Sequence, residues 1–206
     1  MNGVRSHGRR SPPRLSPRSP AATEMAASET QLSTAPNSNG VVLESGDGRR
    51  IVGGSLDATV KMTLDYPALT STFEVVIGPG FDVGAHVHDL GEEIFYIVEG
   101  ELDLFACEPI DRTVADWHDW ESASGERPRR VGPGGFMFVP QGTPHAFGNP
   151  TESHTKVLFQ SSVPGGHENY FDELFAILRE SSGKPNPDVI AELRTRYHIE
   201  QLTTMH

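Results

Sequence analysis

Two histidines separated by a single residue, His86 and His88, precede a pair of adjacent glutamates, Glu92 and Glu93. Side chains at positions i and i+2 of a β-strand point to the same face, roughly 6.5 to 7 Å apart along the strand. Two imidazole rings on one strand can therefore converge on a single ion. Asp89–Gly91 predicts a tight connection to a returning strand, and a carboxylate at the start of that strand can reach the same ion.

Two sequence patterns contain these residues. The first pattern, G-x5-H-x-H-x4-E-x6-G, is met by Gly80, His86, His88, Glu93 and Gly100. The second pattern, G-x5-P-x-G-x2-H-x3-N, is met by Gly134, Pro140, Gly142, His145 and Asn149. Together and in this order the two patterns define the cupin superfamily, which the chain resembles over roughly residues 40–165.

The resemblance implies an all-β fold, a small antiparallel barrel of the jelly-roll or double-stranded β-helix type, with a short C-terminal helical segment. The metal ligands that it implies are His86, His88, Glu93 and His145. Three imidazoles and one carboxylate suit one divalent transition metal (Fe, Mn, Ni, Co or Zn) better than calcium or magnesium. Four protein ligands also leave one or two positions free on a five- or six-coordinate ion. Strand alternation turns Glu92 away if Glu93 points inward.

The rest of the chain predicts the elements that position these residues. Short alternating or β-branched runs between Gly, Asp and Pro predict strands at 41–44, 50–52, 59–64, 72–77, 93–98, 101–106, 136–139, 145–147 and 155–162. Residues 99–101 predict a hairpin turn between two of them. Apolar residues at helical spacing after Glu168 predict a helix that Gly183–Pro185 ends, and Asn186 predicts the cap of a second helix, 188–197. A terminal strand is predicted at 198–202.

We divide the chain into a tail (1–40), a barrel (41–165) and a helical extension that packs on it (166–206). The tail is rich in Ser, Pro and Arg and lacks bulky apolar residues, which predicts disorder. The tail has three alternative interpretations: a basic arm that contacts acidic surfaces, a segment without a function, or an extension upstream of a natural start at Met25. The polar segment 111–135, which contains both tryptophans, predicts either an inserted lid or an irregular excursion anchored by those tryptophans.

Composition excludes several classes of protein. A net charge of −11 argues against a nucleic-acid-binding surface. A single cysteine, Cys107, rules out an intrachain disulfide and a cysteine-based zinc cluster, and we interpret it as an apolar filler. The chain has no apolar run of about 18 residues and no apolar secretory segment near its start, so we expect no membrane partner and a cytoplasmic location. Edge strands favour a homodimer, through the first strands after residue 40 or the C-terminal helices.

The one-barrel layout and the three-His, one-Glu set resemble the bacterial cupins grouped with quercetin (flavonol) dioxygenases. This resemblance implies a metal-dependent dioxygenase of an aromatic or enolisable small molecule, with Glu93 as both ligand and catalytic general base and dioxygen as co-substrate. The alternatives are a non-redox metal cupin (isomerase, epimerase or polyketide cyclase) and a small-molecule-binding cupin without catalysis. Phe95 and Phe147 share strand parity with Glu93 and His145, so they line the cavity or pack in the core. Five histidines outside the patterns are assigned no role: His7, His154, His167, His198 and His206. A sixth, His118, lies between Trp117 and Asp119, and we interpret it as solvent-facing or packed rather than as a ligand.

Overall fold

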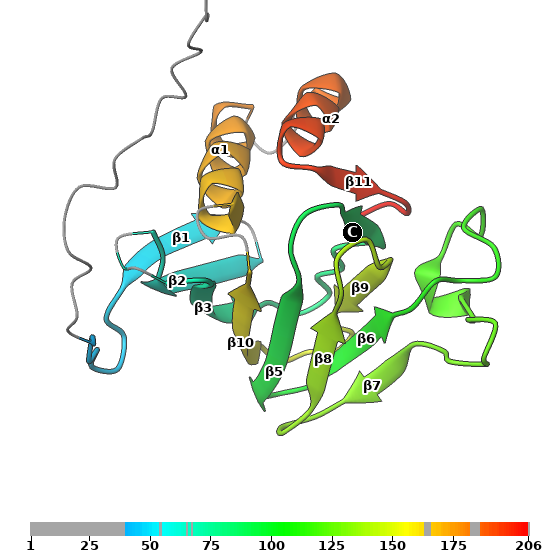
Figure 1. Cartoon of the computed structure of the whole chain (residues 1–206), viewed down its shortest axis with the longest axis horizontal. Helices are drawn as coiled ribbons and strands as arrows, with labels where there is room; N and C mark the ends of the chain where they lie inside the picture. The colour runs from blue at the N-terminus through cyan, green and yellow to red at the C-terminus, as the bar shows by residue number, and fades with distance from the viewer. Residues whose placement is uncertain are drawn as a thin grey trace, which may run out of the picture. The chain divides into compact units, whose positions relative to one another are not determined.

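The computed structural model describes residues 40–205, apart from 54, 65, 67, 163–165 and 182–185. Within these residues the strands form two antiparallel sheets (Figure 1). The first sheet has the order β1 (Arg49–Gly53), β2 (Leu56–Met62), β3 (Ser71–Ile77), β10 (Thr155–Ser161), β5 (Glu93–Glu99) and β8 (Phe136–Val139). The second has the order β11 (Ile199–Gln201), β4 (His86–His88), β9 (His145–Gly148), β6 (Leu102–Ala106) and β7 (Arg129–Val131). The predicted tail, except Gly40, lies outside the described residues.

Alternating burial along the strands builds the core between the two sheets. In β3 the side chains of Phe73, Val75 and Ile77 are buried and those between them are half-exposed, and β10 repeats this pattern. The same core cluster takes Leu102 and Leu104 from the second sheet. A period of two along each strand places one apolar face inward, which is what two packed antiparallel sheets require. The predicted all-β jelly-roll fold is confirmed.

The predicted hairpin at 99–101 is wrong. Strands β5 and β6 do not pair with each other: β5 pairs with β10 and β8, whereas β6 pairs with β9 and β7. Gly100 has a φ of +79°, and a Cβ there would lie 2.5 Å from Thr155 Oγ1, so the glycine is needed where the chain crosses from one sheet to the other. Two apolar strands joined by a glycine look alike in sequence whether they pair or cross, because both arrangements bury one face of each strand.

Two further strand predictions fail. Residues 41–44 form no strand, and Val42 is 93% exposed. Conversely, β7 lies inside segment 111–135, where we predicted none. It pairs with β6, and the Arg130 guanidinium contacts the Asp103 carboxylate at 3.0 and 3.1 Å. The partner strand, rather than an apolar pattern of its own, makes Arg129–Val131 extended.

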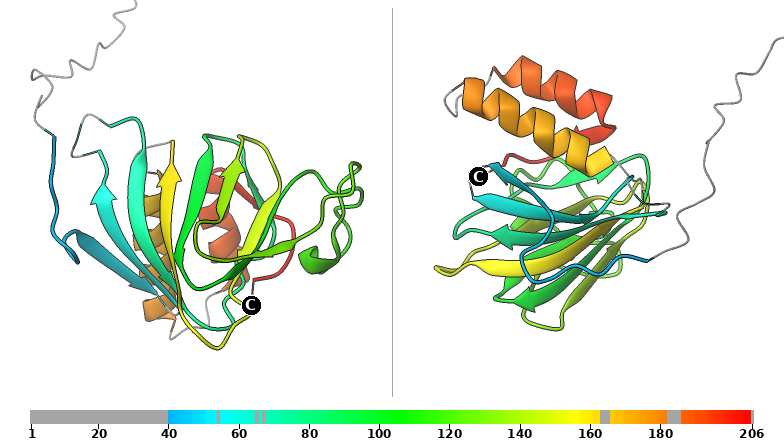
Figure 2. Two further views of the ribbon diagram at one scale, coloured as in Figure 1. Left: turned by 90° about the horizontal axis from the view of Figure 1, so that it is seen from below. Right: turned by 90° about the vertical axis from the view of Figure 1, so that its left-hand side faces the viewer.

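Helices α1 (Gly166–Glu180) and α2 (Pro187–Arg196) lie next to each other on one side of the sheets (Figure 2). The cap of α2 is confirmed, because Asn186 Oδ1 accepts a hydrogen bond from Asp188 N–H at 3.0 Å. Residues 183–185, predicted to end α1, lie outside the described residues. Among the helices of the described part, none is both long and apolar enough to cross a membrane.

Helix α1 packs on β1 through a close approach at Gly53. A Cβ at this position would lie 2.2 Å from the Phe175 ring, and Arg49 Nη1 contacts the Asp172 carboxylate of the same helix at 2.8 Å. We therefore expect Gly53→Ala to push α1 away from the sheet and to lower the free energy of unfolding by about 1–3 kcal/mol. Urea denaturation measures this loss. Gly40→Ala is the matched control, because a Cβ added there would have no neighbouring atom within 4 Å. Equal stability of the two variants would contradict the packing argument.

Candidate metal centre

Adjacent strands of the second sheet carry three histidines. His86 of β4 and His145 of β9 are direct cross-strand partners, and His88 lies two residues further along β4. Their ring centroids are 4.2 Å apart for His86–His145, 5.1 Å for His86–His88 and 5.4 Å for His88–His145. The structure thus brings together side chains that are more than fifty residues apart in the sequence.

Backbone carbonyls orient two of these rings. His86 Nδ1 lies 3.0 Å from Gly84 O, and His145 Nδ1 lies 3.0 Å from Thr143 O. A carbonyl oxygen only accepts hydrogen bonds, so each Nδ1 carries the proton and each Nε2 keeps its lone pair. This tautomer leaves Nε2 free to bind a metal, while a backbone carbonyl holds the second ring nitrogen, as in many histidine metal sites.

Glu93 reaches the histidines from the opposite sheet, at the start of β5. It is buried, with Oε2 at 3.0 Å from His145 Nε2 and Oε1 at 3.3 Å from His88 Nε2. Glu92 is exposed, as strand alternation predicts, and its backbone N–H donates to Ser162 Oγ. The four side chains named from the sequence therefore meet between the two sheets.

Burial and the neighbouring groups set the charges. Burial lowers the pKa of His86 well below its ordinary value, and the nearby His145 and His88 add to this effect. Burial also lowers the pKa of His88 to about 4, although the Glu93 carboxylate acts in the opposite direction. Burial acts to raise the pKa of Glu93, but His88, His145 and His167 outweigh it and hold that pKa well below the usual range. At neutral pH the site thus has a carboxylate beside two neutral imidazoles.

This arrangement fits a divalent cation. His145 Nε2 and Glu93 Oε2 are both acceptors at 3.0 Å, and the buried atoms His145 Nε2 and Glu93 Oε1 make no hydrogen bond in the described part of the chain. Buried polar atoms without partners are costly, and two acceptors that face each other need a cation or a proton between them. His86, His88 and His145 each offer a ligand atom within 4.8 Å of the others, so the cluster could hold a metal. A set of three imidazoles and one carboxylate suits a transition metal.

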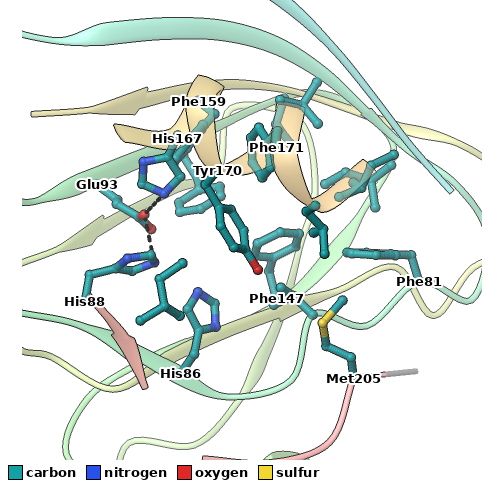
Figure 3. Close-up of a pocket in the computed structure, with 18 of the residues that line it drawn as sticks. Phe81, His86, His88, Glu93, Phe147, Phe159, His167, Tyr170, Phe171 and Met205 are labelled. Carbon is teal, nitrogen blue, oxygen red and sulfur yellow. Dashed lines mark ion pairs between the residues drawn. The ribbon is translucent and has the colours of Figure 1, made fainter. Parts of the chain in front are cut away.

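An apolar cavity of about 90 Å³ opens from the cluster (Figure 3). Its polar lining comprises His86, His88, Glu93, His167 and Gln201. The rest is apolar and largely aromatic: Leu56, Val75, Ile77, Phe81, Val83, Phe95, Phe147, Val157, Phe159, Tyr170, Phe171, Leu174, Ile199 and Met205. Phe95 and Phe147 line this cavity and also pack in or against the main core cluster, so both uses inferred from strand parity apply.

His167, to which we assigned no role, belongs to this site. It lies in the first turn of α1, and its Nε2 is 2.8 Å from Glu93 Oε1. The signal for it was present in the sequence. Tyr170, Phe171 and Leu174, whose apolar spacing predicts the helix, follow His167 at i+3, i+4 and i+7, which places this histidine on the face that the helix buries.

Segment 111–135 does not contribute to the cavity lining, so the described residues give no support to its interpretation as a lid. Its tryptophans are buried in a second core with Ala85, Phe105 and Ala146, which agrees with an excursion anchored by Trp117 and Trp120. Cys107 is partly buried and packs against this second core, and burial raises the pKa of its thiol.

A family model described as Cupin matches residues 64–182, more than half of the chain. The chain belongs to the cupin family. Both motif regions and the cluster of histidines and Glu93 lie inside the matched range. A search of curated proteins finds no match.

Several solved cupin structures are similar to this chain, but only weakly. The polyketide cyclase RemF from Streptomyces resistomycificus is 19% identical, with a TM-score of 0.46 over 60% of this chain and 79% of that chain. KdgF from Halomonas sp. is 15% identical, with a TM-score of 0.47 over 63% and 99%. A sugar phosphate isomerase of the cupin superfamily from Silicibacter pomeroyi is 17% identical, with a TM-score of 0.43 over 59% and 74%.

Proposed function

We propose that this cupin is a metal-dependent enzyme acting on an aromatic or enolisable small molecule, with the metal held by His86, His88, His145 and Glu93. The observation that carries the proposal is the meeting of three imidazoles and one carboxylate at the polar end of an apolar, aromatic-lined cavity. Such a site suits a substrate with an apolar body and a polar group directed at the cluster.

The bound metal would supply a Lewis acid that polarises a substrate oxygen. The protein supplies the rest. Aromatic side chains such as Phe95 and Phe147 hold the apolar body and exclude water. Glu93 is ionised and lies at the boundary of cavity and cluster, so it is placed to take a proton from a substrate carbon or hydroxyl next to the polarised oxygen.

The preferred reaction is oxygenation of the enolised substrate, with dioxygen as co-substrate. The size of the cavity limits the substrate. Its 90 Å³ is well below the roughly 300–1,000 Å³ of pockets that take drug-sized ligands, so a compact substrate fits the cavity and a flavonol requires movement of α1 or of the chain around Met205. We therefore favour small diketones and monocyclic phenols over flavonols.

The second candidate function is a non-redox isomerisation, epimerisation or cyclisation. It is favoured by the same observation, because a carboxylate base beside a Lewis acid suffices for enolisation without an oxidant.

Oxygen dependence separates the two functions. Metal-loaded protein, with His145→Ala as the metal-site control, is assayed against panels of diketones, phenols and flavonols, in air with an oxygen electrode and in anaerobic buffer by product analysis. Oxygen uptake by the wild type alone supports the dioxygenase. Conversion that persists without oxygen supports the non-redox enzyme. Ligand binding with no conversion in either condition contradicts both and supports a binding cupin.

A further inference from the structure

The two oxygens of Glu93 have different neighbours. Oε2 lies 3.0 Å from His145 Nε2, on the side of the histidine cluster. Oε1 lies 2.8 Å from Nε2 of His167 and 3.3 Å from His88 Nε2 (Figure 3). Of the groups around Glu93, His167 is the one carried by a helix, and it lies outside both sequence motifs. Because its Nε2 lies this close to Oε1, His167 can influence how the Glu93 carboxylate is oriented.

The far nitrogen of His167 has a partner of its own. Ser161 Oγ lies 2.9 Å from His167 Nδ1, and Ser161 is the cross-strand partner of Glu93 in the pairing of β10 with β5. Since a carboxylate oxygen only accepts, a hydrogen bond to Oε1 requires the proton on His167 Nε2. Nδ1 then keeps its lone pair and accepts from the Ser161 hydroxyl. His167 therefore lies between the Ser161 hydroxyl, 2.9 Å from its Nδ1, and a carboxylate oxygen 2.8 Å from its Nε2.

Packing holds the His167 ring in this orientation. It makes edge contacts with the Phe159 and Phe171 rings, with centroids 5.0 and 5.9 Å away. The following residue, Glu168, is buried and accepts from Ser71 Oγ at 3.0 Å, which ties the first turn of α1 to β3. A ring held by the Ser161 hydroxyl and by two aromatic neighbours can restrict the rotation of the flexible carboxylate beside it.

We propose that His167 is a positioning residue of the metal site: its Nε2, 2.8 Å from Glu93 Oε1, would donate to that oxygen when Glu93 holds a metal, and would so leave Oε2 to face the ion. The inference rests on the proposed metal site and extends it to the C-terminal helix. With Oε1 engaged by His167, Glu93 would bind a metal through one oxygen, which would leave room for a substrate oxygen on the ion. The proposal therefore gives α1 a part in ordering the site, although His88, Glu93 and His167 also lie close enough together to hold an ion themselves.

The test uses Co²⁺ as the probe and the full-length protein with three variants. His167→Leu fills the space without a donor, His167→Gln restores an N–H near the position of Nε2, and Ser161→Ala removes the hydroxyl that fixes the tautomer. Affinity comes from chelator competition, and the visible absorption of bound Co²⁺ reports its coordination number. His154→Ala, an exposed histidine outside the site, is the matched control.

We expect His167→Leu to keep one Co²⁺ per chain, to bind it about 10–100-fold more weakly and to show a changed spectrum, because outer partners of metal ligands have effects of this size. His167→Gln should return to within about threefold of wild type, and Ser161→Ala should lie between the two. Complete loss of Co²⁺ from His167→Leu would make His167 a ligand and overturn the proposal. Unchanged affinity and spectrum would make it a packing residue and overturn it equally.

A second measurement separates this inference from the metal site itself. In metal-free protein, ¹⁵N–¹H correlation spectra give the tautomer of each histidine. We expect His167 to carry its proton on Nε2 in the wild type and to lose that preference in Ser161→Ala. Wild type that binds no Co²⁺ but shows this tautomer overturns the proposed function and the link to a metal, while the placement of His167 between Ser161 and Glu93 stands. An Nδ1-protonated His167 overturns the positioning role even where the metal binds.

Discussion

Replacing His145 by alanine is expected to reduce bound metal from about one ion per chain to a small fraction, with at least a hundredfold loss of affinity. His145 is fully buried, its Nδ1 is held by Thr143 O, and its Nε2 faces Glu93 Oε2 at 3.0 Å. Removal of an outer partner of a metal ligand already weakens binding 10–100-fold, so removal of a ligand should do more. Elemental analysis after dialysis against a weak chelator measures the change.

Two further variants make this result interpretable. His86→Ala removes the cross-strand partner of His145 and should lose metal to the same degree, whereas His154→Ala should keep wild-type metal content. Circular dichroism checks that each protein is folded. A His145→Ala protein that is folded and still holds one ion would remove His145 from the ligand set. Wild-type protein without metal would contradict the enzymatic functions proposed above.

Replacing Trp117 by alanine is expected to lower the free energy of unfolding by about 3–5 kcal/mol, the usual cost of truncating a buried tryptophan. Trp117 is 2% exposed and its Nε1 donates to the Asp82 carboxylate at 2.9 and 3.0 Å. It packs in the second core with Ala85 and Ala146, the residues that precede His86 and follow His145. The loss should therefore also loosen these two histidines and weaken metal binding.

Chemical denaturation and chelator competition measure the two effects of Trp117→Ala. Trp117→Phe keeps most of the packing and removes the indole donor, so it should lie between alanine and wild type. Val42→Ala, at a position 93% exposed, is the control for a large-to-small change and should leave stability within about 0.5 kcal/mol. Wild-type stability of Trp117→Ala would show that segment 111–135 does not support the sheet, contrary to its place in the second core.

Local patterns in the sequence were sufficient to predict several features of the fold and of the site. The period of two in β3 and β10 predicted the strands, because burial of one face imposes that period. The turn after Asn186 and the apolar spacing in α1 predicted the helices for a similar reason, since caps and helical faces are local properties. Motif spacing predicted that His86, His88, Glu93 and His145 come together, and the structure places them in one buried cluster. Their role as metal ligands stays a prediction.

Strand pairing was decided by the tertiary structure. The hairpin expected at Gly100 is a crossing between sheets, and β7 exists because β6 lies beside it. Glu93 likewise reaches the histidines across the core and not from a neighbouring strand. A strand buries the same face whichever partner it takes, so its sequence contains little information about the partner.

His167 also shows which features of the site the sequence predicted and which depended on the tertiary structure. Its sequence neighbours predicted a helix with one apolar face, which placed the histidine on the buried side of that helix. They did not predict which part of the protein that face contacts. Only the packing of α1 over the barrel brings its Nε2 to within 2.8 Å of Glu93. The types and spacing of the motif residues thus determined the family and the candidate ligands. The arrangement of sheets and helix decided which further groups act on them, because contacts between distant segments depend on how whole elements pack.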